Sequence, residues 1–147
     1  MVIVFFGFVP VGGTYYVQAL TWTPDVTIAS LICGLLIDTL LVVNNYRDRE
    51  VDARSGKRTV IVRFGEKFGR YFYLMLGITA SLLCLCFLRE GHFYAAFLPQ
   101  LYLIPHFLTW KRMVKIYSGK KLNSILGETS RNMLLMGILI AIGMLIN

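Results

Sequence analysis

Five apolar runs, separated by short polar segments, limit what this chain can fold into. They cover residues 2–20, 25–46, 72–88, 93–110 and 132–146. A helix of about 20 apolar residues can cross the hydrocarbon core of a bilayer, because each residue adds about 1.5 Å. Only 16% of the residues are charged, whereas soluble domains carry about 25%. The sequence therefore predicts an all-α, polytopic transmembrane helix bundle of about five helices, forming a single domain over residues 1–147.

The cations gather in two segments between these runs. Residues 47–70 hold eight Lys and Arg against four acids, and residues 111–131 hold six against one. Loops rich in Lys and Arg remain in the cytoplasm. We therefore expect both segments and the N-terminus on the cytoplasmic side and the C-terminus outside. The net charge of +7 is explained by these loops, so we expect no nucleic-acid partner.

The stretch from Asn44 to Thr59 directly follows the second apolar run and carries the candidate site. Asp48 and Asp52 are four residues apart, so on a helix they share one face, and Asn45 lies about one turn earlier. Mg²⁺ commonly takes one or two carboxylates together with the oxygens of a substrate phosphate. Asp48 and Asp52 are therefore the predicted metal ligands, at the cytoplasmic end of a membrane helix.

A basic turn follows the two aspartates. Lys57, Arg58 and Arg63 can neutralise the oxygens of a diphosphate. The same cations have an alternative explanation, because a cytoplasmic loop needs positive residues to set the orientation of the protein.

Two nearby acids have other expected roles. Glu50 points to another side of the helix and is predicted to be a solvated partner of Arg47 or Arg54. Asp38 lies inside the apolar run, about two turns before Asn45 on the same face. A carboxylate within a membrane span is a candidate for function. A protonated Asp38 that hydrogen-bonds a neighbouring helix is the alternative that the sequence leaves open.

Other polar residues in the apolar runs are expected to serve mainly in packing. The polar residues within 14–18 fit an interfacial aromatic belt with interhelical hydrogen bonds, or else one wall of a substrate cavity. His106 is predicted to be packed and hydrogen-bonded. The three cysteines lie within apolar runs and argue against a disulfide framework.

The motif around the two aspartates resembles the second aspartate-rich motif of the UbiA-type intramembrane prenyltransferases. The resemblance is closest to the branch that acts on 1,4-dihydroxy-2-naphthoate in menaquinone synthesis, and it is strongest from about Phe5 to Gly69. The residues that carry it are Asn44-Asn45-Tyr46-Arg47-Asp48-x-x-x-Asp52-x-x-x-Gly56-Lys57-Arg58-Thr59, Val62-Arg63-x-Gly65 and, upstream, Gly12-Gly13-Thr14-Tyr15-Tyr16-Val17-Gln18.

This resemblance implies a nine-helix bundle in the bacterial inner (cytoplasmic) membrane, with a cavity that opens to the cytoplasm. Two aspartate-rich motifs would hold Mg²⁺, which binds the diphosphate of a polyprenyl donor. After the diphosphate leaves, the aromatic ring attacks the allylic cation and, in this branch, loses its carboxylate. Carried over to this sequence, Asp48 and Asp52 would be the catalytic metal ligands. The diphosphate contacts would be Asn44, Asn45, Lys57, Arg58 and Arg63.

One large departure from the family pattern is the absence of its first motif, Asn-Asp-x-x-x-Asp-x-x-x-Asp in outline. We therefore expect this chain to be the last five of nine helices, N-terminally incomplete and inactive alone. It would need the missing N-terminal helices or a second copy as a partner. The alternatives are a prenyltransferase for another aromatic quinone precursor, such as homogentisate, and a non-enzymatic polytopic transport or scaffold protein.

Overall fold

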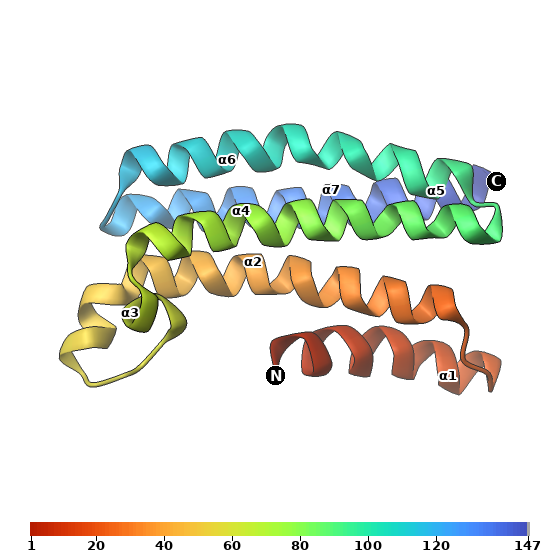
Figure 1. Ribbon diagram of the computed structural model, residues 1–147, viewed down its shortest axis with the longest axis horizontal. Coiled ribbons are helices and arrows are strands. Elements are labelled where there is room, and N and C mark those ends of the chain that lie inside the picture. Colours follow the sequence, from red (N-terminus) through yellow and green to blue (C-terminus); the bar gives the residue numbers. More distant parts are fainter. Residues whose placement is uncertain (147) are drawn as a thin grey trace.

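The computed structural model describes residues 1–146, and the regular structure within that range is all helical (Figure 1). This confirms the predicted all-α class. In chain order the elements are η1 (Val4–Gly12), α1 (Gly13–Ala19), α2 (Pro24–Arg54), α3 (Val60–Phe64), α4 (Glu66–Leu83), η2 (Cys84–Glu90), α5 (Phe93–Phe97), η3 (Leu98–Tyr102), α6 (Leu103–Ile116), η4 (Lys120–Leu122) and α7 (Asn123–Ile146). Within this range all of them except the short helix α3 run together into five rods: η1 with α1, α2, α4 with η2, α5 with η3 and α6, and η4 with α7.

Helix α2 is the element on which the others are arranged. It begins where the Thr23 hydroxyl accepts a hydrogen bond from the Val26 amide at 3.4 Å and Pro24 takes the first helical position. It has 31 residues, which corresponds to about 46 Å, whereas the hydrocarbon core of a bilayer is about 30 Å thick. The last turns of α2 therefore extend beyond the apolar layer.

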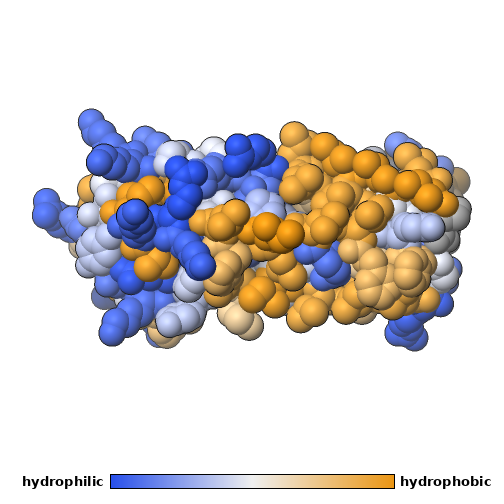
Figure 2. Space-filling model, turned by 90° about the horizontal axis from the view of Figure 1, so that it is seen from above, coloured by the Kyte–Doolittle hydropathy of each residue, from blue (hydrophilic) through white to orange (hydrophobic). Residues whose placement is uncertain are grey.

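The surface matches a protein embedded in a membrane. Figure 2 shows hydrophilic residues gathered at the end of the molecule that carries α3, and hydrophobic residues over its middle. Three helices are long and apolar enough to cross a bilayer, and they run over Pro24–Arg54, Glu66–Glu90 and Lys120–Ile146. The first rod and the rod from α5 to α6 remain predicted spans.

The prediction for the second basic segment was wrong in its boundaries. Residues 111–131 were expected to form a loop followed by a short span, but α6 continues to Ile116 and α7 already begins at Asn123, with 24 residues. Polar residues that interrupt the apolar pattern lie within these helices and contact the neighbouring helix. Glu128 of α7 forms an ion pair with Arg112 of α6.

Polar side chains join the helices inside the bundle. The Tyr73 and Thr129 hydroxyls are 3.1 Å apart, which links α4 to α7. The Asn132 amide donates to the Thr109 hydroxyl at 2.9 Å, which links α7 to α6. Such bonds are typical of helix association in membranes, where apolar surface alone gives little preference for a neighbour.

His106 serves packing, as predicted. Its ring stacks on Tyr73 and Tyr102 with centroids 4.7 and 5.0 Å away, and its Nδ1 lies 2.9 Å from the Tyr102 hydroxyl. It fits only because Gly77 faces it, since a Cβ built there would lie 2.2 Å from the imidazole. The three cysteines are free thiols, so the expectation of no disulfide framework is also confirmed.

Candidate functional site

The candidate site lies at the polar end of α2, where the helix emerges from the apolar layer. Asp48 and Asp52 both belong to this helix, as the spacing predicted. The Asp48 side chain is 37% exposed and that of Asp52 is 10% exposed. The two carboxylates therefore differ in their access to solvent.

Arg47 holds Asp48 in a network that sequence reasoning missed. The guanidinium donates from Nε and Nη2 to the two oxygens of Asp48 at 2.7 and 2.6 Å. Nη2 also donates to Asn44 at 2.7 Å, and Nη1 donates to Asn123, the first residue of α7, at 3.0 Å. A bidentate Arg–carboxylate pair fixes both position and orientation. The i,i+3 spacing of Asn44 and Arg47 could have predicted their contact from the sequence. No feature of the sequence could have predicted the contact with Asn123.

Asp52 is tied to the basic turn. Gly56 has a φ of +75°, which lets the chain turn back at the end of α2. The Lys57 backbone amide then donates to the Asp52 carbonyl at 2.9 Å, and Lys57 Nζ lies 3.3 Å from the Asp52 carboxylate. Thr59 starts α3 by accepting a hydrogen bond from the Val62 amide. Three residues of the Gly-Lys-Arg-Thr sequence therefore have a structural role in this turn, namely Gly56, Lys57 and Thr59.

Asn45 lies on a different side of α2 from Asn44. It lines a cavity of about 260 Å³ together with Asp38, and the residues before η1, α3 and Phe72 of α4 complete the lining. Asp38 and Asn45 therefore line one cavity, as their shared helical face allowed. The lining includes only these two of the four polar residues expected on that face, and neither Asp48 nor Asp52 is among its residues.

The remaining predicted residues are not brought to the aspartates. Arg58 is exposed on the turn, and the Arg63 guanidinium lies over the Phe64 ring, 5.5 Å from its centroid. The expected partner of Glu50 was wrong: its nearest cation is Arg49, at 4.0 Å. Arg47 instead pairs with Asp48. The Arg47 side chain is long enough for its guanidinium to reach the carboxylate of the next residue.

An aromatic and charged cluster fastens this end of α2 to the rest of the bundle. The Arg49 guanidinium lies between the rings of Tyr46 and Tyr117, 4.5 and 5.0 Å from their centroids. Arg70 donates to the Tyr46 hydroxyl at 2.9 Å, and Glu66 pairs with both arginines. The neighbouring Glu66 carboxylate raises the pKa of the Tyr117 hydroxyl. The cluster therefore joins α2 to the beginning of α4 and to Tyr117, next to α6.

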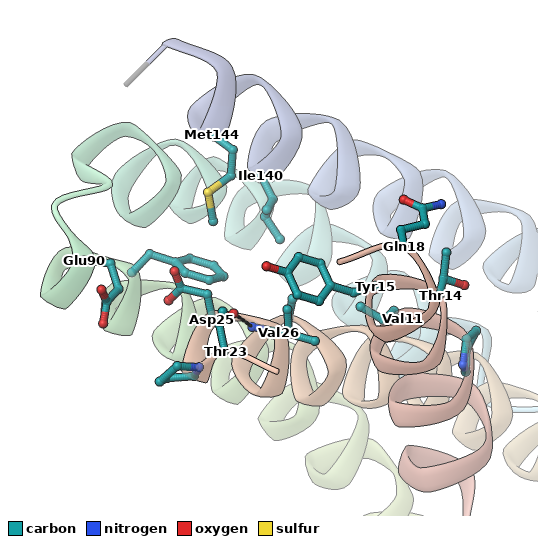
Figure 3. Close-up of a pocket in the computed structure, with 14 residues that line it drawn as sticks. Val11, Thr14, Tyr15, Gln18, Thr23, Asp25, Val26, Glu90, Ile140 and Met144 are labelled. Carbon is teal, nitrogen blue, oxygen red and sulfur yellow. Dashed lines mark hydrogen bonds between the residues drawn. The ribbon is translucent and has the colours of Figure 1, made fainter. Parts of the chain in front are cut away.

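Another large cavity lies at the opposite end of the molecule (Figure 3). It measures about 750 Å³, and its lining includes Thr14, Tyr15 and Gln18 of α1, Asp25 of α2 and Glu90 of η2. Figure 3 shows the Tyr15 ring projecting from α1 into this space. Of residues 14–18, Thr14, Tyr15 and Gln18 line this cavity, which is remote from the aspartates, and both alternatives for these residues stay predictions.

Comparison with known proteins settles the family. The profile of the UbiA prenyltransferase family matches residues 1–145. The chain belongs to this family. Together with the three apolar helices, this family makes the chain an integral membrane protein.

Three relatives carry the same description, 1,4-dihydroxy-2-naphthoate octaprenyltransferase. The Haemophilus influenzae protein is 35% identical over 149 residues, which covers 99% of this chain and 47% of that protein. The Escherichia coli protein is 42% identical over 57% of this chain and 27% of its own length. The Mycobacterium tuberculosis protein is 42% identical over 56% and 28%. The chain spans about half the length of the first relative. No solved structure gives a significant match.

The side chains of this family member fit a magnesium ion better than a softer metal. Asp48 and Asp52 offer carboxylate oxygens one helical turn apart, and Asn44 adds an amide beside Asp48. Within residues 1–146, no group of three or more His, Cys, Asp or Glu side chains forms a complete metal cage. A hard cation that draws its other ligands from substrate phosphate and water suits such a donor set.

Proposed function

We propose that this chain forms part of an enzyme that transfers a polyprenyl group from polyprenyl diphosphate to 1,4-dihydroxy-2-naphthoate in menaquinone biosynthesis. The described relatives carry this activity in their names, and one of them aligns with almost the whole chain. The enzyme would lie in the bacterial inner membrane with the aspartates on the cytoplasmic side. Its other partners would be the helices of an N-terminal half or a second copy of the chain.

The observation that carries this proposal is the position of two carboxylates on the polar end of a membrane-spanning helix, each already paired with a cation. Arg47 pairs with Asp48 at 2.6 Å, and Lys57 pairs with Asp52 at 3.3 Å. A diphosphate with its metal carries both kinds of charge, so Asp48 and Asp52 would hold the metal and the neighbouring cations would neutralise phosphate oxygens.

Asp48 and Asp52 would hold Mg²⁺, with Asn44 beside Asp48 through Arg47 and Asn45 as a more remote contact in the 260 Å³ cavity. When bound, the metal would stabilise the negative charge of the departing diphosphate. Lys57, which pairs with Asp52, would neutralise the same leaving group, and Arg58 on the turn and Arg63 in α3 would be outer cations. The apolar helices below the site exclude water, which would otherwise capture the allylic cation before the aromatic ring does.

Substitutions in a full-length enzyme that carries this sequence test the proposal. We expect Asp48→Asn and Asp52→Asn each to lower prenyl transfer by about 100-fold or more, since each removes a charged metal ligand. Glu50→Gln is the matched control, because its side chain is 65% exposed and pairs only with Arg49 at 4.0 Å. Turnover is measured with polyprenyl diphosphate, dihydroxynaphthoate and Mg²⁺ at equal protein abundance. Equal losses in Glu50→Gln and Asp52→Asn would contradict the assignment.

A further inference from the structure

We propose that Asn123, at the start of α7, is a further contact for the diphosphate of the prenyl donor, and that Arg47 positions it. This inference rests on the proposed function. It adds a residue 76 positions away from Arg47 along the chain, and it makes α7 a second wall of the site.

Arg47 is the centre of the arrangement. Its guanidinium donates four hydrogen bonds, two to Asp48, one to Asn44 and one to Asn123, over distances of 2.6–3.0 Å. Its side chain is 26% exposed, so the guanidinium is partly buried between α2 and α7. A planar guanidinium with this many partners has a fixed orientation. Asn44, Asp48 and Asn123 are therefore held as one unit.

The chemistry of Arg47 determines which way both amides face. A guanidinium only donates hydrogen bonds, so the atom that each asparagine turns toward it is the oxygen Oδ1. The amino groups of Asn44 and Asn123 are then directed away from Arg47. Among the hydrogen bonds of residues 1–146, these two side chains take part only through Oδ1. Their amino groups remain as donors beside Asp48, and donors suit the oxygens of an anion.

An adjoining cavity indicates what kind of anion this is. A space of about 480 Å³ opens next to Asn44, between η1, α2 and α7. Its lining is mostly apolar, and α7 contributes the residues one and two turns beyond Asn123. The lining residues are Val2, Phe6, Ile37, Leu40, Leu41, Asn44, Leu126, Gly127 and Ser130.

A polar group of amide donors above an apolar cavity fits an amphiphile with an anionic head and a hydrocarbon tail. The prenyl donor has this form: its diphosphate would lie by Asn44 and Asn123, and its first isoprene units would enter the space between α2 and α7. Asn123 itself is exposed, so a ligand can reach it without displacing core residues.

Two substitutions at one position separate a substrate contact from a structural link. Asn123→Ala removes both the acceptor for Arg47 and the amino donors. Asn123→Asp keeps an oxygen for Arg47 but replaces the donors with a negative charge. If Asn123 only joined α7 to α2, Asn123→Asp would be the milder change. If its amide donates to diphosphate, Asn123→Asp is the more damaging one. Ser124→Ala is the control, since Ser124 is the next residue of α7 and its hydroxyl donates to the Lys121 carbonyl.

The experiment uses the full-length enzyme in lipid nanodiscs. Binding of inorganic pyrophosphate with Mg²⁺ is measured by titration calorimetry, and KM values are measured for both substrates. We expect Asn123→Ala to weaken pyrophosphate binding and raise the KM for the prenyl donor about tenfold, the usual effect of losing one hydrogen bond to a charged group. Asn123→Asp should weaken both further. The KM for dihydroxynaphthoate and the thermal midpoint should not change.

Two outcomes would overturn the inference. One is pyrophosphate affinity in Asn123→Asp equal to that of Ser124→Ala. The other is a loss in Asn123→Ala that Asn123→Asp restores, which would leave only a structural link. Asp48→Asn, measured in parallel, reports on the proposed function itself: if it leaves pyrophosphate binding unchanged, the metal site is wrong, whatever Asn123 does.

Discussion

The two ends of the molecule hold their carboxylates in different ways. At the α3 end, Asp48, Asp52 and Glu66 each pair with a cation within 4.0 Å. At the opposite end, Asp25 and Glu90 line the 750 Å³ cavity and take part in no ion pair within residues 1–146. One oxygen of Asp25 is buried there and has no hydrogen-bond partner in the described range.

This difference favours the paired aspartates over the larger cavity as the proposed site. A large pocket is the default candidate for a binding site. The acids of the larger cavity, Asp25 and Glu90, form no ion pair within residues 1–146, so their charges disfavour a diphosphate there. The smaller space by Asn44 adjoins the network of Arg47 and Asp48, so we expect the anion and its divalent metal at this end. The following predictions test the contrast between the two ends.

The first prediction is that the two ends lie on opposite sides of the membrane. Single cysteines at Ser55 and Gly91, in a background without the native thiols, should differ completely in intact cells. Gly91→Cys should react with an impermeant thiol reagent, and Ser55→Cys should react only after permeabilisation. Labelling of Ser55→Cys from outside would place the basic turn on the wrong side for a cytoplasmic site.

The second prediction concerns the 147 residues expressed alone in lipid. We expect no measurable prenyl transfer, because two carboxylates supply only part of the charge needed to hold Mg²⁺ against a diphosphate. Activity should appear when the N-terminal half of a full-length relative is co-expressed, as assayed with polyprenyl diphosphate, dihydroxynaphthoate and Mg²⁺. Turnover by the chain alone would instead point to a site completed between two copies.

The third prediction compares one side chain from each end. Lys57→Met removes the partner of Asp52, whose side chain is only 10% exposed, and we expect the KM for the prenyl donor to rise about tenfold. Glu90→Gln changes an acid in the opposite cavity and should leave this KM within about twofold. Steady-state kinetics on the full-length enzyme measure both. A larger effect of Glu90→Gln would mean that the opposite cavity takes part in the reaction.

The smallest expected effect is that of Asp38→Asn. Asp38 faces the 260 Å³ cavity with Asn45 but is not among the partners of Arg47 or Lys57. We expect turnover to fall by no more than about threefold. A loss as large as that of Asp48→Asn would extend the site along α2 into the membrane and favour the functional alternative for Asp38.

The sequence by itself determined the features that depend on consecutive residues. The length and apolarity of the runs predicted the helical class, because a membrane helix must satisfy its own backbone. The four-residue spacing of Asp48 and Asp52 placed them on one helix, and the motif around them indicated the family. Each of these is a local property that can be read along the chain.

Only the tertiary structure decided which groups meet. The contact between Arg47 and Asn123 depends on how α2 and α7 pack, and no local pattern encodes the relation of two helices 76 residues apart. The same packing extends α6 and α7 into the second basic segment, where Glu128 pairs with Arg112. Just beyond this segment, Asn132 donates a hydrogen bond to Thr109. It also divided Asn44 from Asn45: neighbours in sequence point about 100° apart on a helix, so adjacent asparagines face different cavities.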